Sequence, residues 1–134
     1  MHDSLNGLKF LSTNEHYQTK GRFYMSQKKG VALGEKLNLA NLAGYQEGAV
    51  VSRAVIDKPV GTVTAFAFDV GEGLSEHTAP YDALVQVLDG EAEVNIEGTV
   101  QTVTAGEIII MPANRPHSMR AAKRFKMLLI MIRA

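Results

Sequence analysis

The segment LVQVLDGEAEVNIEG, residues 84–98, contains the clearest periodicity in the chain. Every second residue from Ala92 to Ile96 is apolar, and the residues between them are acidic or polar. One face of this stretch is therefore apolar and the other faces water, which is typical of a half-buried β-strand. An Asp-Gly pair at 89–90 precedes it and a Glu-Gly pair at 97–98 follows it, and Asp-Gly supplies the positive φ angles of a tight hairpin turn.

Further strand patterns lie on both sides of this segment. They are rich in β-branched and aromatic residues, and turn residues separate them about every 8–12 positions. AVVSRAVI and GTVTAFAFDV come before it, and TVQTVT, EIIIMP, HSMRAA and FKMLLIMI come after it. We predict that EIIIMP is buried on both faces because its apolar run is continuous. About eight strands with this spacing indicate an all-β fold, either a sandwich or a small barrel.

The composition indicates one globular domain with an N-terminal arm. The chain has 134 residues, 46% of them hydrophobic, and it has no cysteine, which excludes disulfides and thiolate metal sites. Residues 1–35 are predicted to form an arm in which RFYM adds an edge strand or makes a contact with a partner. Residues 36–134 are predicted to form a single barrel domain, with a helical turn near Leu39–Leu42.

The balance of charge makes nucleic acid an unsuitable partner. The chain has 14 basic and 14 acidic residues and a formal net charge of zero, whereas nucleic-acid-binding domains carry an excess of positive charge. No apolar run approaches the roughly 20 residues of a membrane span. The N-terminus also lacks the basic segment followed by an apolar segment that is typical of a secretory signal peptide. We therefore expect no membrane partner and a cytoplasmic location.

Two of the four histidines occupy comparable positions. His77 follows the glycine-containing loop GEGLSE, and His117 follows the turn NRP and opens a strand pattern. Both side chains are therefore able to point into one mouth of a barrel. A lone histidine near a barrel end is more often a hydrogen-bonded structural residue than a ligand, so the residues alone leave both roles open.

Two spaced motifs resemble those of the cupin superfamily. The run from Gly71 to Gly90 is similar to the first cupin motif, and the run that begins at Gly106 is similar to the second. The framework matches at Gly71, His77, Gly90, Gly106, Pro112 and His117. The resemblance covers about residues 50–132 and implies a cupin-type double-stranded β-helix, or jelly-roll barrel, with a pocket at one end.

The same resemblance implies a metal site that this chain retains only in part. Family sites use two histidines and a glutamate from the first motif and one histidine from the second, a set that suits Zn, Ni, Fe or Mn. Here Ala79 and Ala83 occupy the positions of the second histidine and the glutamate. His77 and His117 therefore form an incomplete ligand set for a divalent transition metal.

Other departures concern the residues around these positions. Asn114 replaces the glycine of the second motif, and Ala121 replaces its asparagine. Glu76 and Asp82 are the nearest carboxylates, but each is one residue out of register with the family position, which turns a strand side chain to the opposite face. A local bulge would be needed to bring either of them into the site.

The two alanines suggest a ligand pocket in place of a metal site. Ala79 and Ala83 leave more space and a more apolar wall than an imidazole and a carboxylate, and Met119 shares a face with His117. Such a pocket fits a small, partly apolar ligand held by His77 and His117. The alternative is that methionines, which pack well into irregular gaps, fill the space.

Three functions remain open, and the catalytic residues are unknown. The first is a cupin that binds a small ligand through His77 and His117, with catalysis undecided. The second is a metal-dependent cupin enzyme, similar to a dioxygenase or an isomerase, in which water or another residue completes the site. The third is a sensory or interaction module.

The apolar density of two strand patterns predicts a homodimer. FKMLLIMI is apolar at nearly every position and LVQVL has a similar density, so both faces of these strands are expected to be covered. A small barrel cannot cover both faces of its own sheets. A second copy related by a two-fold axis is the commonest way to cover them.

Overall fold

The computed structural model describes residues 15–19, 22–26 and 31–133, which form ten strands and one short 3-10 helix, η1 (Leu39–Asn41). The strands are β1 (Glu15–Thr19), β2 (Arg22–Ser26), β3 (Ala49–Lys58), β4 (Gly61–Phe68), β5 (Gly73–His77), β6 (Ala83–Ile96), β7 (Thr99–Thr104), β8 (Ile108–Met111), β9 (His117–Arg120) and β10 (Phe125–Ile132). The all-β architecture predicted from the sequence is confirmed. No helix in the described part of the chain is long and apolar enough to cross a membrane.

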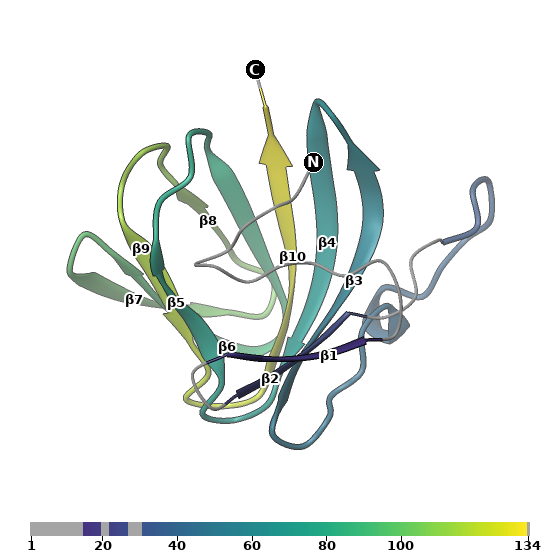
Figure 1. Ribbon diagram of the computed structural model, residues 1–134, viewed down its shortest axis with the longest axis horizontal. Coiled ribbons are helices and arrows are strands. Elements are labelled where there is room, and N and C mark those ends of the chain that lie inside the picture. Colours follow the sequence, from purple (N-terminus) through teal and green to yellow (C-terminus); the bar gives the residue numbers. More distant parts are fainter. Residues whose placement is uncertain (1–14, 20–21, 27–30, 134) are drawn as a thin grey trace.

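The strands form two sheets that share β6 (Figure 1). The first half of β6 pairs with β10 and β8, and this sheet has the order β1-β2-β3-β4-β10-β6-β8. The second half of β6 pairs with β7 and β9, and the second sheet has the order β7-β6-β9-β5. In Figure 1, β5, β7 and β9 lie on one side and β3, β4 and β10 on the other. This is the double-stranded β-helix that the motifs implied.

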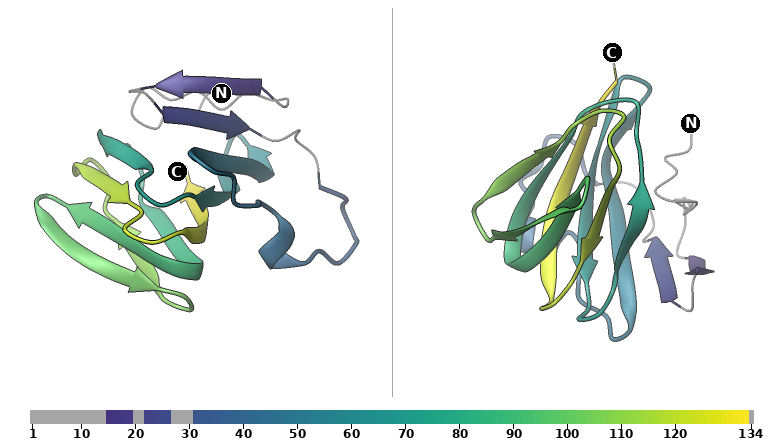
Figure 2. Two further views of the ribbon diagram at one scale, coloured as in Figure 1. Left: turned by 90° about the horizontal axis from the view of Figure 1, so that it is seen from below. Right: turned by 90° about the vertical axis from the view of Figure 1, so that its left-hand side faces the viewer.

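RFYM forms a strand as predicted, β2, but this strand lies second from the edge, because β1 is the outermost described strand of the sheet. The strand β2 pairs in parallel with the start of β3 and antiparallel with β1, and Figure 2 shows β1 and β2 along one margin of the molecule. The rest of the predicted arm before residue 31, namely residues 1–14, 20–21 and 27–30, lies outside the described residues. The boundary between arm and barrel at residue 35 stays a prediction.

Gly90 lies in the middle of β6, and the predicted hairpin turn at this Asp-Gly pair is wrong. The strand continues through Gly90, whose φ is 73°. Residues 105–107 on one side and β10 on the other hydrogen-bond to this part of β6, so the positive φ bends the strand between the two sheets and does not reverse it. The tight turn lies instead at Glu97 and Gly98, between β6 and β7, where both φ angles are positive.

The core between the sheets is apolar and includes stacked aromatic rings. Phe66, Phe68 and Phe125 are fully buried. The ring centroids of Phe66 and Phe68 are 5.6 Å apart, and those of Phe68 and Phe125 are 4.4 Å apart. Phe66 and Phe68 of β4 therefore point into the core. Burial of each such side chain contributes about 1.5–3 kcal/mol to stability.

Residues 31–48 cover part of the outer face of the first sheet. Leu42 and Ala43 pack on apolar side chains of β3 and β4 and on Leu128 of β10. The predicted helical turn is confirmed as η1, and the side chain of Asn38 accepts a hydrogen bond from a backbone N–H of its first turn. This segment therefore covers the outer face of the first sheet at β3, β4 and Leu128 of β10.

Polar contacts hold the end of this segment against the barrel. The hydroxyl of Tyr45 donates to Asp89 at 2.5 Å, and the guanidinium of Arg124 lies 5.2 Å from the centre of the tyrosine ring. Asp69 accepts hydrogen bonds from Gly48 N and Arg124 Nε. These bonds lower the pKa of Asp69 to about 2, so this carboxylate is ionised under ordinary conditions.

The outer faces of β8 and β10 remain partly exposed, and the prediction that EIIIMP is buried on both faces is wrong. Ile108 and Ile110 are 56% and 54% exposed, whereas Met111 is buried. Among the described strands β8 pairs only with β6 at a sheet edge, and only its inner face meets the core. β10 alternates in the same way and ends at the exposed Ile132. The homodimer stays a prediction.

Candidate functional site

His77 and His117 lie side by side at the ends of neighbouring strands. His77 ends β5, His117 begins β9, and the two residues are register partners across these antiparallel strands. Their ring centroids are 4.5 Å apart, and the ring planes cross at 73°. The structure therefore brings together the two imidazoles that the turn positions predicted, and both line one cavity.

The local backbone sets the tautomer of both rings. Nδ1 of His77 lies 2.8 Å from the carbonyl oxygen of Ser75, and Nδ1 of His117 lies 3.0 Å from that of Arg115. Because a carbonyl oxygen only accepts hydrogen bonds, Nδ1 carries the proton in each ring and Nε2 keeps a lone pair. Nε2 of His77 is buried and has no hydrogen-bond partner among the described residues. The site thus presents two hydrogen-bond acceptors.

Both imidazoles favour the neutral form. Burial lowers the pKa of His77 below its ordinary value of 6.5, and the hydrogen bond to Ser75 opposes this shift. Burial also lowers the pKa of His117, and the proximity of His77 lowers it further. A neutral imidazole with its proton on Nδ1 is a base at Nε2 and has no proton to donate there.

The three pocket residues predicted from the sequence line the same cavity. Ala79, Ala83 and Met119 are all buried and face it together with the two histidines. The remaining lining residues are apolar as well: Leu74, Met111, Leu129 and Met131. The two imidazoles are therefore the only polar side chains in the lining.

Some residues of the site were not identified from the sequence. Leu129 and Met131 are inward-facing residues of β10, but the continuous apolar run of that strand hides which residues face inward. The carbonyl groups of Ser75 and Arg115 leave no sequence signal, because any residue two positions before the histidine supplies one. The strand alternation of β10 is the one signal that could have identified its two residues.

The cavity is nearly filled in this structure. About 10 Å³ of space remains, which is roughly the room needed by one water molecule. Three of the nine lining residues are methionines, the side chain that adapts most readily to irregular gaps. A ligand larger than water fits only after these side chains change rotamer.

The residues of this cavity do not fit a divalent metal ion. Stable metal sites normally use three or four protein ligands, and this cavity provides two nitrogen atoms. Glu76 is exposed, and Asp82 accepts a hydrogen bond from Ala113 N at 2.9 Å outside the cavity. Within residues 31–133 no three or more His, Asp or Glu side chains are grouped to hold a metal.

The lowered pKa values predict that stability falls as the solution becomes acidic. Both histidines have a folded-state pKa below 6.5, so the unfolded chain binds more protons than the folded chain just below that pH. The stabilising effect is complete above pH 6.5, declines as the pH falls below this unfolded value, and is lost once the pH has fallen through the lower folded values. We expect the urea midpoint of the wild type to drop between about pH 7.5 and about pH 5.

The variant His77→Gln,His117→Gln serves as the control for this pH dependence. Glutamine keeps a polar side chain and does not titrate, so the drop over the same interval should be smaller. Asp69 does not contribute there, because its pKa is lowered from 3.8 to about 2 and its effect is lost only at lower pH. A variant that shows the same drop as the wild type would contradict the assignment to these two rings.

Comparison with protein families gives one match over more than half of the chain. The family model described as Cupin domain matches residues 65–133. This range contains both histidines, both alanine positions, the second half of β4 and all of the six strands from β5 to β10. No curated protein matches the chain.

Several solved structures are similar to this chain. A conserved protein of unknown function from Streptococcus pyogenes is 30% identical with a TM-score of 0.74, over 78% of this chain and 91% of that chain. A cupin 2 conserved barrel domain protein from Leptotrichia buccalis is 45% identical with a TM-score of 0.71, over 72% of this chain and 47% of that chain. A mutant salicylate 1,2-dioxygenase from Pseudoaminobacter salicylatoxidans is 14% identical with a TM-score of 0.58, over 62% of this chain and 26% of that chain. This last similarity concerns the fold alone.

Proposed function

Because this chain belongs to the cupin family, we propose that it binds a small, partly apolar ligand inside the barrel through His77 and His117. In this proposal the ligand donates hydrogen bonds to Nε2 of the two rings. One observation supports it most strongly: Nε2 of His77 is buried in an otherwise apolar cavity and has no partner among the described residues. A buried acceptor without a partner costs about 1–3 kcal/mol, which a donating ligand would recover.

The chemistry of the lining narrows the class of ligand. Two acceptors and no side-chain donor suit a hydroxyl, a phenol or an amide N–H attached to an apolar body. A carboxylate is disfavoured because its oxygens would face the lone pairs of both imidazoles in a site with little water. The ligand class is therefore neutral and hydrogen-bond donating.

Access to the cavity requires local rearrangement. Backbone and side-chain bonds join the two loops beside it, since Asn114 N donates to Ala79 O at 2.7 Å and Ala113 N donates to Asp82. These loops open at a lower free energy than the paired strands, and the methionine side chains provide the adaptable wall. We therefore expect the ligand to associate with this cavity more slowly than a ligand associates with an open surface pocket.

The same geometry supports binding better than acid–base catalysis. A general acid and a general base need imidazoles in opposite protonation states. In this site both Nε2 atoms are acceptors, and both pKa values are lowered. The two rings therefore have the same role, which suits the capture of a donor group.

Phenol is the probe that tests this proposal. Phenol added to the ¹⁵N-labelled full chain is expected to shift the Nε2 resonance of His77, because the single phenol O–H donates a hydrogen bond to this buried nitrogen, which has no partner among the described residues. Toluene has nearly the same shape without a donor, and benzoate carries a charge. We expect phenol to bind about tenfold more tightly than toluene, the difference that one buried hydrogen bond supports, and benzoate to bind least.

Two types of variant serve as controls. Glu76→Gln changes an exposed neighbour of His77 and should leave phenol binding unchanged, whereas His77→Phe should remove the preference for phenol over toluene. Absence of phenol binding to the wild type contradicts the ligand-binding proposal. Equal affinity for phenol and toluene, with unchanged Nε2 resonances, contradicts the donor requirement alone.

A further inference from the structure

A second buried polar atom lies close to the cavity of the two histidines. The hydroxyl oxygen of Thr62 on β4 is buried and, like Nε2 of His77, has no hydrogen-bond partner among the described residues. Thr62 as a whole is only 3% exposed. Such a hydroxyl destabilises the folded chain unless another molecule provides the missing hydrogen bond.

Strand pairing places Thr62 next to the wall of this cavity. Thr62 is the register partner of Met131 on β10, and Met131 is in turn the partner of Ala83 on β6. Residues opposite each other on neighbouring strands point to the same face of a sheet. Met131 and Ala83 both line the cavity, so Thr62 lies one strand further along the same inner face.

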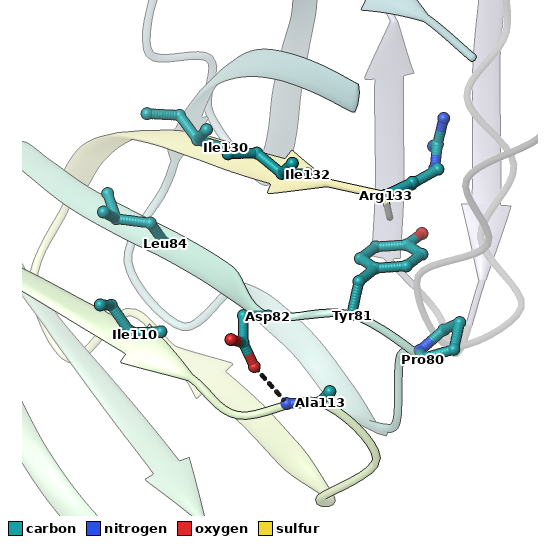
Figure 3. A pocket seen from close by; sticks show the side chains of 9 residues that line it. All are labelled: Pro80, Tyr81, Asp82, Leu84, Ile110, Ala113, Ile130, Ile132 and Arg133. Atoms are coloured by element: carbon teal, nitrogen blue, oxygen red, sulfur yellow. Dashed lines mark hydrogen bonds between the residues drawn. The ribbon is translucent and has the colours of Figure 1, made fainter. Parts of the chain in front are cut away.

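The outward residues of the same strands agree with this orientation. Figure 3 shows Ile130 and Ile132 of β10 and Leu84 of β6 along a groove on the outer face of the first sheet. Because successive residues of a strand point to opposite faces, Met131 points inward from between the two isoleucines. Met131 therefore stands between Thr62 and the cavity.

The side chain that separates Thr62 from the cavity is an adaptable one. Methionine is unbranched and changes rotamer readily, so a ligand that moves Met131 aside gains access to the hydroxyl of Thr62. We propose that Thr62 is a specificity-determining residue of the ligand site and bonds a second polar group of the ligand, at the end away from His77. This inference rests on the proposed function and deepens it. A threonine hydroxyl both donates and accepts hydrogen bonds, so the second polar group is a hydroxyl or a carbonyl.

Two matched ligands test the role of Thr62. The compounds 4-hydroxybenzyl alcohol and 4-ethylphenol share a phenol and have nearly the same shape, but only the first has a second hydroxyl. Thr62→Val keeps the shape of the side chain and removes its hydroxyl. We expect this change to shift the ratio of the two affinities about tenfold in favour of 4-ethylphenol, the factor that one buried hydrogen bond supports. Calorimetric titration of the full chain measures both affinities.

Two further variants serve as controls for Thr62→Val. Thr62→Ser keeps a hydroxyl at this position and should keep the affinity ratio of the wild type. Thr64→Val removes a hydroxyl from a residue of β4 that is also buried but is the register partner of Leu129, and it should leave the ratio unchanged. Without ligand, Thr62→Val should raise the urea midpoint, because it removes a buried hydroxyl that has no partner.

The outcomes separate this inference from the proposed function. If phenol binds but the affinity ratio is the same in the wild type and in Thr62→Val, the role of Thr62 is overturned and the proposed function stands. A wild type that binds none of these phenols overturns both. A lower urea midpoint of ligand-free Thr62→Val also overturns the role of Thr62, because its hydroxyl would then have a partner in the free protein.

Discussion

A variant that carries Ala79→His and Ala83→Glu is expected to bind close to one divalent transition metal ion per chain, and the wild type far less. Both alanines line the same cavity as His77 and His117, whose Nε2 atoms already have lone pairs. The substitutions raise the ligand set to three imidazoles and one carboxylate, which is the number that stable sites use. Elemental analysis of protein purified without an affinity tag measures the metal content.

Metal binding is expected to raise the unfolding free energy of the same variant. The larger side chains overfill a cavity with little free space, so the metal-free variant should lose about 1–3 kcal/mol of unfolding free energy. Zinc at a hundred times its dissociation constant should return about 2.7 kcal/mol. Ala79→Gln with Ala83→Gln adds similar volume without strong ligands and is the control. A folded double variant with no more metal than this control would show that the four positions do not converge.

Gly90→Ala is expected to destabilise the protein by about 4 kcal/mol or more, or to prevent folding. An added Cβ would lie 1.8 Å from the carbonyl oxygen of Arg124, and the φ of Gly90 is 73°. That oxygen belongs to the backbone just before β10, which is paired along its length. Neither strand is able to move away without loss of its pairing. Urea denaturation of the purified variant measures the effect.

Gly98→Ala separates steric overlap from backbone strain. Gly98 also has a positive φ, 89°, but a Cβ there would meet no atom within 4 Å. Its substitution should therefore cost only the left-handed backbone conformation, about 1–2 kcal/mol. If Gly90→Ala proves no more harmful than Gly98→Ala, the close approach of the two strands at Gly90 is not a structural constraint.

The fold was predictable because its signals are local. The alternation from Ala92 to Ile96 matches the inward and outward positions of β6, and Gly71 and Gly106 adopt the positive φ angles that turn glycines favour. Like Gly71 and Gly106, Gly90 is followed by a glutamate in the sequence, yet it lies within a strand and bends it. Its conformation depends on contacts with residues 105–107 and β10, and no local pattern contains that information.

The site was predictable in its position but not in its volume. The strand ends placed His77 and His117 correctly, because turn residues mark where strands begin. The free space depends on how Leu129 and Met131 point, and a continuous apolar run does not show which residues face inward. For the same reason the sequence did not indicate that Ile110 faces outward.

β6 is hydrogen-bonded along both edges for most of its length, with β10 and β8 beside its first half and β7 and β9 beside its second. Its amide protons are therefore expected to exchange with deuterium only when the whole domain unfolds, whereas those on the outer edge of β8 exchange earlier. Because one continuous strand belongs to both layers, neither layer is able to melt while the other persists. Unfolding should thus occur as one cooperative transition, with coincident curves from fluorescence and circular dichroism.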